Sequence, residues 1–480
     1  MVFVILLEKN IFKNILHLFF STAFTRVANA VTIILLAGHI GAEEYGMFSL
    51  CVAYALIAGY FTDMGVKNIV MREASIENAN ISSIMSSYIK IRIYLLLLTL
   101  FISALIFVSF YDSAKLIKVL FLLVFPTVIG LTMQSIAITY FQFTEEMNFI
   151  SNIKVLSAIT CTIVVLFGMW VGWGVDLISL FYGLSYIVAG VYGLYLLFKN
   201  IELDLKCKLE KSSFKGLPSF IISGLLIMLI PQIGILTIEK VLSLKEVGFY
   251  SVAYRIPTAL YQIPGVVAGA FYPVLFKHHS SNNHIAHRET NVKQVKIMSV
   301  MGMLASLPLF FYPEWIIKTL FGEQWLPASP LLQTLSIVVV LQSINFPLGD
   351  GLTTKGKQQL RTIVLGISVL SGILYYYFLS LKLGNVGAAY AAVLVETTMF
   401  ISFIVVNKDR MWIIKKALLV NILLYLLILL LGTRLWSHSN FYVGTTLNCV
   451  LLITLFILTN KEMRRYIIQF KESKQLGKSR

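Results

Sequence analysis

Apolar residues in this sequence are grouped into long runs that are separated by short polar connections. A transmembrane helix needs about 20 mostly apolar residues, and fourteen segments meet that condition. The pattern predicts membrane-spanning helices at about residues 15–38, 45–66, 88–110, 116–140, 153–171, 174–198, 216–238, 246–276, 294–317, 328–351, 361–381, 386–406, 412–433 and 441–459. The predicted fold class is an all-α integral membrane protein with about 14 transmembrane helices.

The composition supports this prediction and excludes several classes of protein. Of the 480 residues, 58% are hydrophobic and 13% are charged, whereas soluble domains are about 45–50% apolar and about 25% charged. Charge this sparse cannot cover the surface of a soluble enzyme, and a disordered chain would be less apolar. The four cysteines lie far apart without metal-ligand spacing, so we expect no disulfide framework and no metal site. The sequence has no phosphate-binding loop of the GxxxxGK[ST] type, which argues against ATP-driven transport, and we expect no cofactor.

Basic residues exceed acidic ones by 39 to 23, a net charge of +16. In a soluble chain this excess would suggest nucleic-acid binding, but in a membrane protein it favours cations on the cytoplasmic side. If the N-terminus is cytoplasmic, 30 of the 39 Lys and Arg residues lie on that side, seven lie on the other, and two lie within spans. The distribution predicts that both termini are cytoplasmic, and it removes the reason to expect nucleic acid.

A weaker signal indicates an internal repeat. Shifting the sequence by 202 residues aligns Glu44–Ser49 with Glu246–Ser251, and the Glu, Gly and Ser positions match. An offset of six helices predicts two parallel six-helix lobes, which would occupy residues 1–200 and 201–410. Two extra transmembrane helices (411–460) and a basic cytoplasmic tail (461–480) would follow, with the tail contacting anionic lipids. The alternative is a chance similarity between two helix starts.

Two arginines lie deep within predicted spans. Arg26 is at the middle of the first span, and Arg255 is nine residues into the eighth, about 13 Å deep at 1.5 Å per residue. Burying a guanidinium in a membrane costs about 2.5–3.5 kcal/mol on insertion scales. Because a guanidinium binds phosphate through two parallel hydrogen bonds, the pair predicts a cationic cavity for an anionic substrate. Alternatively, each arginine pairs with a buried carboxylate and only fixes packing.

Fewer carboxylates lie within the spans. Glu396 is central in the twelfth span, and Asp63 lies near the cytoplasmic end of the second. A buried carboxylate whose surroundings change between two states can bind and release a cation, so both residues are candidates for ion coupling. The alternatives are a salt bridge from Glu396 to one of the arginines and a purely local role for Asp63 at its helix end.

Prolines predict bends in two spans. Pro231 lies in the seventh span, and Pro257, Pro264 and Pro273 lie in the eighth. Proline removes an intrahelical hydrogen bond and bends the helix. Broken helices beside a buried charge are typical of a moving transporter element, although proline is also common in static membrane helices.

Several motifs resemble the polysaccharide (O-antigen or capsule) flippases of the multidrug/oligosaccharidyl-lipid/polysaccharide exporter superfamily. The first runs from Arg26 through Leu36–Ser49 to Asp63-Met64-Gly65 and Val70–Glu73. The segment Glu239–Arg255 is similar to the seventh and eighth helices of that family, and Gly384–Ala391 resembles its twelfth. The resemblance extends over about residues 11–410, and the order and spacing of the motifs carry its specificity.

The resemblance implies two six-helix lobes with a cavity that opens alternately outward and inward. The implied substrate is an undecaprenyl-diphosphate-linked oligosaccharide, moved across the bacterial cytoplasmic membrane without enzymatic catalysis. Implied partners are this lipid-linked substrate, membrane lipids, and a polysaccharide polymerase with its chain-length regulator. In the family, basic residues of helices 1, 2 and 8 line the cavity. Arg26 and Arg255 match the first and third, but the second helix has no central arginine here.

Two other functions are compatible with parts of the pattern. A multidrug or organic-cation antiporter of the same superfamily would be expected to line its cavity with acids rather than arginines. An integral-membrane glycan polymerase or ligase would be expected to have a large external loop, and the predicted connections are short.

Overall fold

The computed structural model describes residues 2–74, 80–203, 217–436 and 439–460, and every regular element within these ranges is helical. The long helices are α1 (Val2–Phe61), α3 (Ile81–Phe110), α4 (Ala114–Phe143), α5 (Met147–Val171), α6 (Val175–Asn200), α9 (Leu244–Leu260), α10 (Gln262–Ser280), α11 (His284–Phe311), α13 (Ser329–Thr353), α14 (Gln358–Val406), α16 (Leu419–Leu435) and α17 (Phe441–Thr459). Shorter helices are α2 (Val66–Ala74), α7 (Leu217–Leu229), α8 (Ile233–Val241), α12 (Pro313–Phe321) and α15 (Arg410–Ile413). The predicted all-α membrane fold is confirmed.

Each predicted span coincides with helical residues, but two helices contain two spans each. Helix α1 covers the first and second spans and is interrupted at Gly41, where φ is 74°. Helix α14 covers the eleventh and twelfth and is interrupted at Gly384, where φ is 59°. Both angles lie in the left-handed region that glycine adopts without strain. Within the described residues, ten helices are long and apolar enough to cross a membrane, or eleven with one bent pair; the count of fourteen crossings stays a prediction.

The bends expected from proline are present. Helices α7 and α8 are separated by a break that contains Pro231, and their axes differ by 56°. The eighth span is divided into α9 and α10 at Tyr261, between Pro257 and Pro264. The missing backbone donors of proline explain why neither span is one continuous helix.

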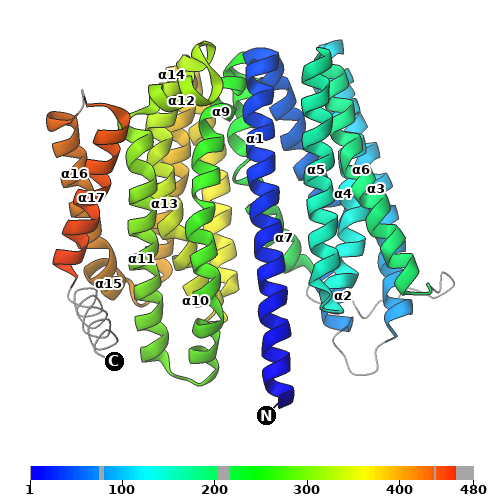
Figure 1. Cartoon of the computed structure of the whole chain (residues 1–480), viewed down its shortest axis with the longest axis horizontal. Helices are drawn as coiled ribbons and strands as arrows, with labels where there is room; N and C mark the ends of the chain where they lie inside the picture. The colour runs from blue at the N-terminus through cyan, green and yellow to red at the C-terminus, as the bar shows by residue number, and fades with distance from the viewer. Residues whose placement is uncertain (1, 75–79, 204–216, 437–438, 461–480) are drawn as a thin grey trace, which may run out of the picture. The chain divides into compact units, whose positions relative to one another are not determined.

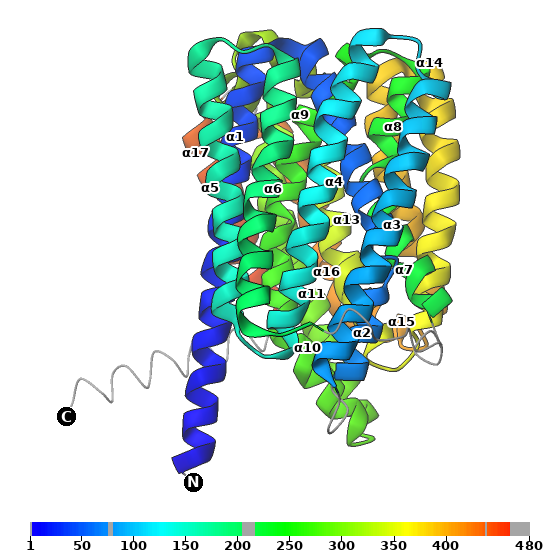
Figure 2. The same ribbon diagram turned by 90° about the vertical axis from the view of Figure 1, so that its right-hand side faces the viewer.

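Contacts divide the chain into two compact units, Met1–Val252 and Ala253–Arg480. In the first unit, α4 lies between α3 and α6 (Figure 2). Its contact with α6 is close because glycines meet bulky neighbours there: a Cβ on Gly183 would lie 2.6 Å from Cγ of Pro126, and one on Gly190 would lie 2.7 Å from Cβ of Met133. Small residues let membrane helices approach closely, so the α4–α6 pair forms a dense support for its neighbours.

In the second unit, α10, α11 and α13 run side by side, and α16 and α17 pack beside α11 (Figure 1). Polar side chains attach α16 to α11. The hydroxyls of Ser306 and Tyr425 are 2.8 Å apart, and Asn421 Nδ2 donates to Ser299 Oγ at 2.8 Å. The proposed division into 201–410 and 411–460 is a prediction from the repeat, and the two hydrogen bonds show how α16 is held against α11.

The two copies of the repeat motif pack against each other inside the first unit. A methyl group on Gly46 would overlap the carbonyl oxygen of Leu244, and a methyl group on Gly248 would overlap the carbonyl oxygen of Ala42. The two contacts are reciprocal, because the same 202-residue shift carries Ala42 to Leu244 and Gly46 to Gly248. A chance similarity of helix starts does not predict a symmetric contact, so the geometry supports the internal repeat.

Helix α3 shows the character of a lipid-facing element. Its side chains Leu97, Phe101 and Val108 are 62%, 63% and 65% exposed. Contiguous exposed apolar side chains like these are rare on soluble monomers. The chain is a multi-pass membrane protein.

Candidate functional site

Arg26 lies in the first half of α1, as the sequence predicts, but its side chain is outside the described part of the structure. Its neighbours Thr25 and Asn29 are described, and both line a pocket. Because they are four residues apart in a helix, they lie on one face, one above the other. The predicted role of Arg26 itself stays a prediction.

Arg255 lies in α9, eleven residues after its start at Leu244, so it is about 16 Å along the helix. Its side chain is half-buried, and no ion pair of Arg255 is found among the described residues. The alternative of a packing salt bridge with a buried acid therefore has no support in the second unit as described.

Glu396 is buried in α14 and is held by two amides of α13. Gln342 Nε2 donates to Oε1 at 3.0 Å, and Asn345 Nδ2 donates to Oε2 at 2.8 Å. The amide oxygens of the same side chains, Gln342 Oε1 and Asn345 Oδ1, are buried without a hydrogen-bond partner in the described structure. Because buried polar groups are nearly always satisfied, each of these two amide oxygens has unused capacity to accept a further contact. The salt bridge considered for Glu396 is not found among the described residues.

Asp63 has a different environment at the turn after α1. Arg92 Nη1 contacts Asp63 Oδ1 at 2.7 Å, and the Tyr88 hydroxyl donates to the same oxygen at 3.1 Å. Arg92 is 1% exposed, so this is a buried guanidinium whose charge Asp63 balances. Burial lowers the pKa of the nearby Lys67, and Arg92 adds to that effect while the negative charge of Asp63 opposes it. The geometry gives Asp63 a structural partner, and its role in coupling stays a prediction.

A third carboxylate, Glu239, connects α8 to the turn between α3 and α4. The Tyr111 hydroxyl donates to Glu239 Oε2 at 3.2 Å and lies 2.8 Å from the Tyr54 hydroxyl. Lys240 Nζ pairs with Glu239 at 3.4 Å and lies 3.8 Å from the centre of the Tyr111 ring. Burial, with the Tyr54 contact next, raises the pKa of Tyr111. Glu239 is thus tied to its own unit at the predicted outer end of its span.

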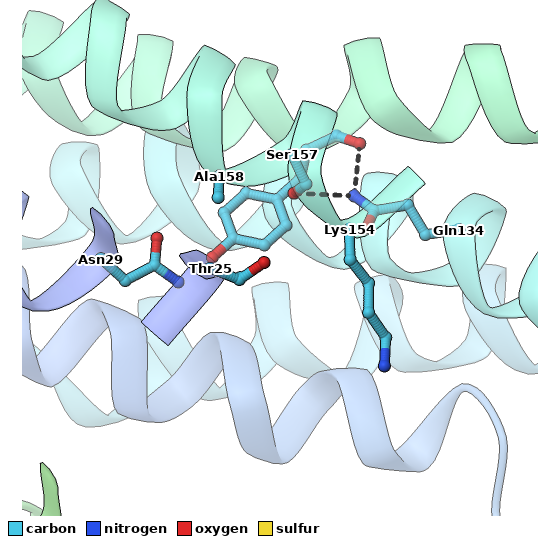
Figure 3. Close-up of a pocket in the computed structure, with 7 residues that line it drawn as sticks. Thr25, Asn29, Gln134, Lys154, Ser157 and Ala158 are labelled. Carbon is cyan, nitrogen blue, oxygen red and sulfur yellow. Dashed lines mark hydrogen bonds between the residues drawn. The ribbon is translucent and has the colours of Figure 1, made fainter. Parts of the chain in front are cut away.

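The first unit contains a polar pocket of about 260 Å³ that is lined by residues of α1, α4, α5 and α6. Figure 3 shows Thr25 and Asn29 on one side and Gln134 with Ser157 on the other, with Lys154 extending away from that pair. Gln134 Nε2 donates to Ser157 Oγ at 3.4 Å and to the Tyr186 carbonyl oxygen at 2.9 Å. The six polar lining residues are Thr25, Asn29, Gln134, Lys154, Ser157 and Tyr186.

Two cations of this unit were grouped with the cytoplasmic charges in the sequence, and both are inside the fold. Lys154 lines the pocket because α5 begins at Met147, six residues before the predicted span. Arg92 is buried although it lies only four residues inside the predicted third span. The residues just before 153 are polar, so the apolar pattern placed the start of α5 too late. The acidic pair Glu145-Glu146, directly before the true start at Met147, was the signal that could have located it. No group of three or more His, Cys, Asp or Glu side chains suited to a metal is present in the described residues.

Comparison with known proteins identifies the family of this chain and a solved structure with a similar fold. The model of a family described as "Polysaccharide biosynthesis protein" matches residues 35–330. The chain belongs to this family. A lipid II flippase solved in an inward closed conformation, MurJ, has the same fold, with a TM-score of 0.71 and 15% identity over 94% of this chain and 99% of that one.

Two curated relatives show the sequence similarity. The teichuronic acid biosynthesis protein TuaB of Bacillus subtilis is 29% identical over 151 residues, which is 31% of this chain and 30% of TuaB. The lipopolysaccharide biosynthesis protein WzxC of Escherichia coli K12 is 21% identical over 341 residues, which is 68% of this chain and 66% of WzxC. The chain thus spans about a third of the first relative and just under two thirds of the second.

Proposed function

We propose that the chain is a flippase for an undecaprenyl-diphosphate-linked oligosaccharide, such as an O-antigen or capsule repeat unit. It moves this substrate from the inner to the outer leaflet of the cytoplasmic membrane by alternating access, and it catalyses no chemical reaction. Family membership supports the proposal, as do the relatives named for teichuronic acid and lipopolysaccharide biosynthesis and the shared fold of a lipid II flippase. The charged head group of such a substrate needs polar and cationic side chains within the apolar helices, because it cannot cross the bilayer without them.

The observation that carries the proposal is the pair of deep arginines. Arg255 is half-buried among apolar helices without an ion pair in the described residues, and an unpaired intramembrane cation is costly unless a ligand or water compensates it. Arg26 lies in α1, at the middle of the first predicted span. In the transport cycle each contacts the diphosphate, whose oxygens accept the paired hydrogen bonds that a guanidinium donates.

Ion coupling belongs to Glu396 in this proposal. The carboxylate and the unpartnered oxygens of Gln342 and Asn345 would hold a proton or a sodium ion, because hard cations prefer oxygen ligands. Asp63 is the second candidate, and its pairing with Arg92 ranks it below Glu396. The dependence of transport on an ion gradient in a Glu396→Gln variant tests this assignment.

The remaining parts of the proposal concern location and partners. The chain lies in a bacterial cytoplasmic membrane with both termini in the cytoplasm, as the distribution of Lys and Arg favours. Its partners are the lipid-linked oligosaccharide, membrane lipids, and a polysaccharide polymerase with a chain-length regulator that use the flipped units. No nucleic acid is involved.

The test is replacement of Arg26 and of Arg255 by alanine in a host that depends on this chain for surface polysaccharide. Each variant should lose most of the surface polysaccharide, while lipid-linked units accumulate on the cytoplasmic side and the protein remains folded in the membrane. Loss of one charge-assisted contact corresponds to about a tenfold or greater reduction. Surface polysaccharide is measured by immunoblot, and folded protein by fluorescence size-exclusion chromatography.

Arg434→Ala is the matched control, because Arg434 is exposed at the end of α16. It should leave export unchanged. Full complementation by both Arg26→Ala and Arg255→Ala would remove the basis for the binding assignment. Normal polysaccharide in a strain without the chain, together with lost efflux of organic cations, would favour the antiporter instead.

A further inference from the structure

The indole ring of Trp412 is contacted by two cations that come from different helices. Trp412 lies in α15, and Lys416 follows four residues later in the π-helical segment Ile414–Leu418, so both side chains lie on one face of the helix. Lys416 Nζ is 3.6 Å from the centre of the ring. Cζ of Arg288, from the second turn of α11, is 4.1 Å from the same centre. We refer to Arg288, Trp412 and Lys416 as the Trp412 cluster.

The two cations of the cluster have no counter-ion in the part of the chain that the structure describes. No ion pair of Arg288 or Lys416 is found there, and Arg288 Nε has no hydrogen-bond partner. Of the nearby acids, Glu289 makes no ion pair in these residues, and Asp409 pairs with Lys355 at 2.5 Å. Like charges on one ring repel each other, and a cation–π contact contributes only about 0.5–1 kcal/mol at exposed sites. An anion beside the ring would supply the missing negative charge.

Two more cations extend this positive surface. Arg410 lies two residues before Trp412 and Lys415 three residues after it, and both are exposed. Neither makes an ion pair among the described residues. Lysines on the predicted outer side are arranged differently; Lys115, for example, pairs with Glu44 at 2.6 Å. The positive charge around Trp412 is therefore available to a ligand.

The Trp412 cluster lies at the predicted level of the lipid head groups on the cytoplasmic side. Trp412 begins the thirteenth predicted span, and Arg288 lies six residues before the ninth. Apolar side chains next to the cluster are exposed, with Met411 at 54%, Leu419 at 49% and Val420 at 43%. A ligand with an anionic head and apolar tails can contact both surfaces, whereas a soluble anion contacts only the first. This combination indicates a phospholipid.

We propose that the Trp412 cluster binds the phosphate of an anionic phospholipid from the cytoplasmic leaflet. The terminal nitrogens of Arg288 donate paired hydrogen bonds to two phosphate oxygens, and Lys416 contacts the same phosphate as a point charge. Trp412 holds both cations in place, while the acyl chains lie along Met411 and the start of α16. Basic sites between membrane helices on the cytoplasmic side bind anionic head groups in this way. The inference does not rest on the proposed function, because this lipid is not the cargo.

The test is native mass spectrometry of the full chain in detergent, titrated with phosphatidylglycerol or with phosphatidylcholine of the same acyl chains. The first phosphatidylglycerol should bind about tenfold more tightly than the first phosphatidylcholine, the magnitude of one charge-assisted hydrogen bond. The double variant Arg288→Gln/Lys416→Gln should lose this preference. A natural chain without the preference, or a double variant that keeps it, overturns the proposal.

The matched control is Lys199→Gln/Lys277→Gln. It removes two exposed lysines of the same predicted side, from the last turns of α6 and α10, and should keep the preference. An equal loss in both double variants would show that net charge attracts the lipid, which contradicts a defined site.

Variants of Trp412 test the geometry without changing the charge. Trp412→Leu removes the ring that positions the two cations, so the preference for phosphatidylglycerol should fall severalfold. Trp412→Phe keeps an aromatic face and should retain most of it. If both variants bind phosphatidylglycerol as the natural chain does, the ring does not organise the site and the proposal is wrong.

Two further probes separate the possible sources of the phosphate. Glycerol phosphate has no acyl chains, so it should not displace phosphatidylglycerol at equal concentration. Farnesyl diphosphate carries a diphosphate on a prenyl chain, as the proposed cargo does, and should bind equally to the natural chain and to Arg288→Gln/Lys416→Gln. Displacement by glycerol phosphate would identify a soluble ligand, and loss of farnesyl diphosphate binding in the double variant would identify a cargo site. Either result overturns the phospholipid assignment.

The binding assay requires no transport, so this proposal and the proposed function can fail separately. A chain that prefers phosphatidylglycerol through the Trp412 cluster but moves no lipid-linked glycan in proteoliposomes contradicts the proposed function alone. A chain that flips the glycan without that preference contradicts the lipid site alone.

Discussion

Glu396 is held by two neutral amides, whereas Asp63 is paired with a buried guanidinium. The difference decides what each carboxylate contributes. Among the described residues, removing the charge of Glu396 leaves no opposite charge unbalanced. Removing the charge of Asp63 leaves Arg92, which is 1% exposed, without its counter-ion, and breaking a buried pair in this way is strongly destabilising.

Neutral replacements of the two carboxylates should therefore affect different properties of the protein. Glu396→Gln should abolish the dependence of transport on the proton or sodium gradient with little change in thermal stability. Asp63→Asn should lower the free energy of unfolding by about 3 kcal/mol, because Asp63 is partly exposed and the loss falls at the lower end for buried pairs. Proteoliposome transport under imposed gradients measures the first, and melting in detergent measures the second.

Asp176→Asn provides the matched control for the stability arm. Asp176 pairs with Lys118 at 2.5 Å, but the two side chains are 29% and 61% exposed. An exposed pair is worth about 0–1 kcal/mol, so the melting temperature should hardly move. An Asp63→Asn variant as stable as Asp176→Asn would show that the Arg92 pair is not structural.

At the scale of helices, the reciprocal contact of the repeat motifs is the tightest of the described glycine contacts in the first unit. Gly46 faces the Leu244 carbonyl and Gly248 faces the Ala42 carbonyl, with no room for a side chain at either position. Backbone contact of this kind holds the start of the second span against the start of α9. Two glycines of α10 differ, because a Cβ on Gly265 or Gly269 would meet no described atom within 4 Å.

Alanine should therefore act oppositely at the two glycine pairs. Gly46→Ala and Gly248→Ala should each destabilise the fold by about 1–3 kcal/mol, the usual cost of overpacking, and should reduce surface polysaccharide. Gly269→Ala should be neutral or stabilising by up to about 1 kcal/mol, since alanine is the better helix former. Thermal melting of the purified variants measures all three. Equal stability of Gly46→Ala and Gly269→Ala would contradict the contact.

The helical elements could be predicted well from the sequence, because each depends on local signals. Apolar runs located the spans, Pro231 located a bend, and the gaps between predicted spans contain the interruptions observed at Gly41 and Gly384. The candidate site depends on contacts between distant residues. Asp63 and Arg92 are 29 residues apart, and they meet because of a turn with positive φ at Met64 and Gly65. The hydrophobic pattern carries no information on such pairing. It also placed Lys154 with the cytoplasmic charges rather than in the pocket.

At the scale of the whole molecule, orientation and the number of crossings are linked. The kink at Gly384 divides α14 into two predicted spans, and reading α14 as a single crossing would reverse every later connection. The excess of Lys and Arg on one side depends on the same division. The 202-residue repeat also requires it, because the second lobe reaches six helices only if α14 supplies two.

Cysteine labelling in intact cells should resolve this point. In a chain whose four native cysteines are replaced by alanine, Lys382→Cys and Asn440→Cys should react with a membrane-impermeant maleimide from outside, because both exposed positions fall on the predicted outer side. Asn282→Cys, exposed between α10 and α11, should react only after permeabilisation, which makes it the internal control. Failure of Lys382→Cys to react either before or after permeabilisation would mean that α14 crosses the membrane once, because residue 382 is the middle of α14 and would then lie within the bilayer. In that case Asn440→Cys would be cytoplasmic, and both the fourteen-helix topology and the six-helix second lobe would have to be abandoned.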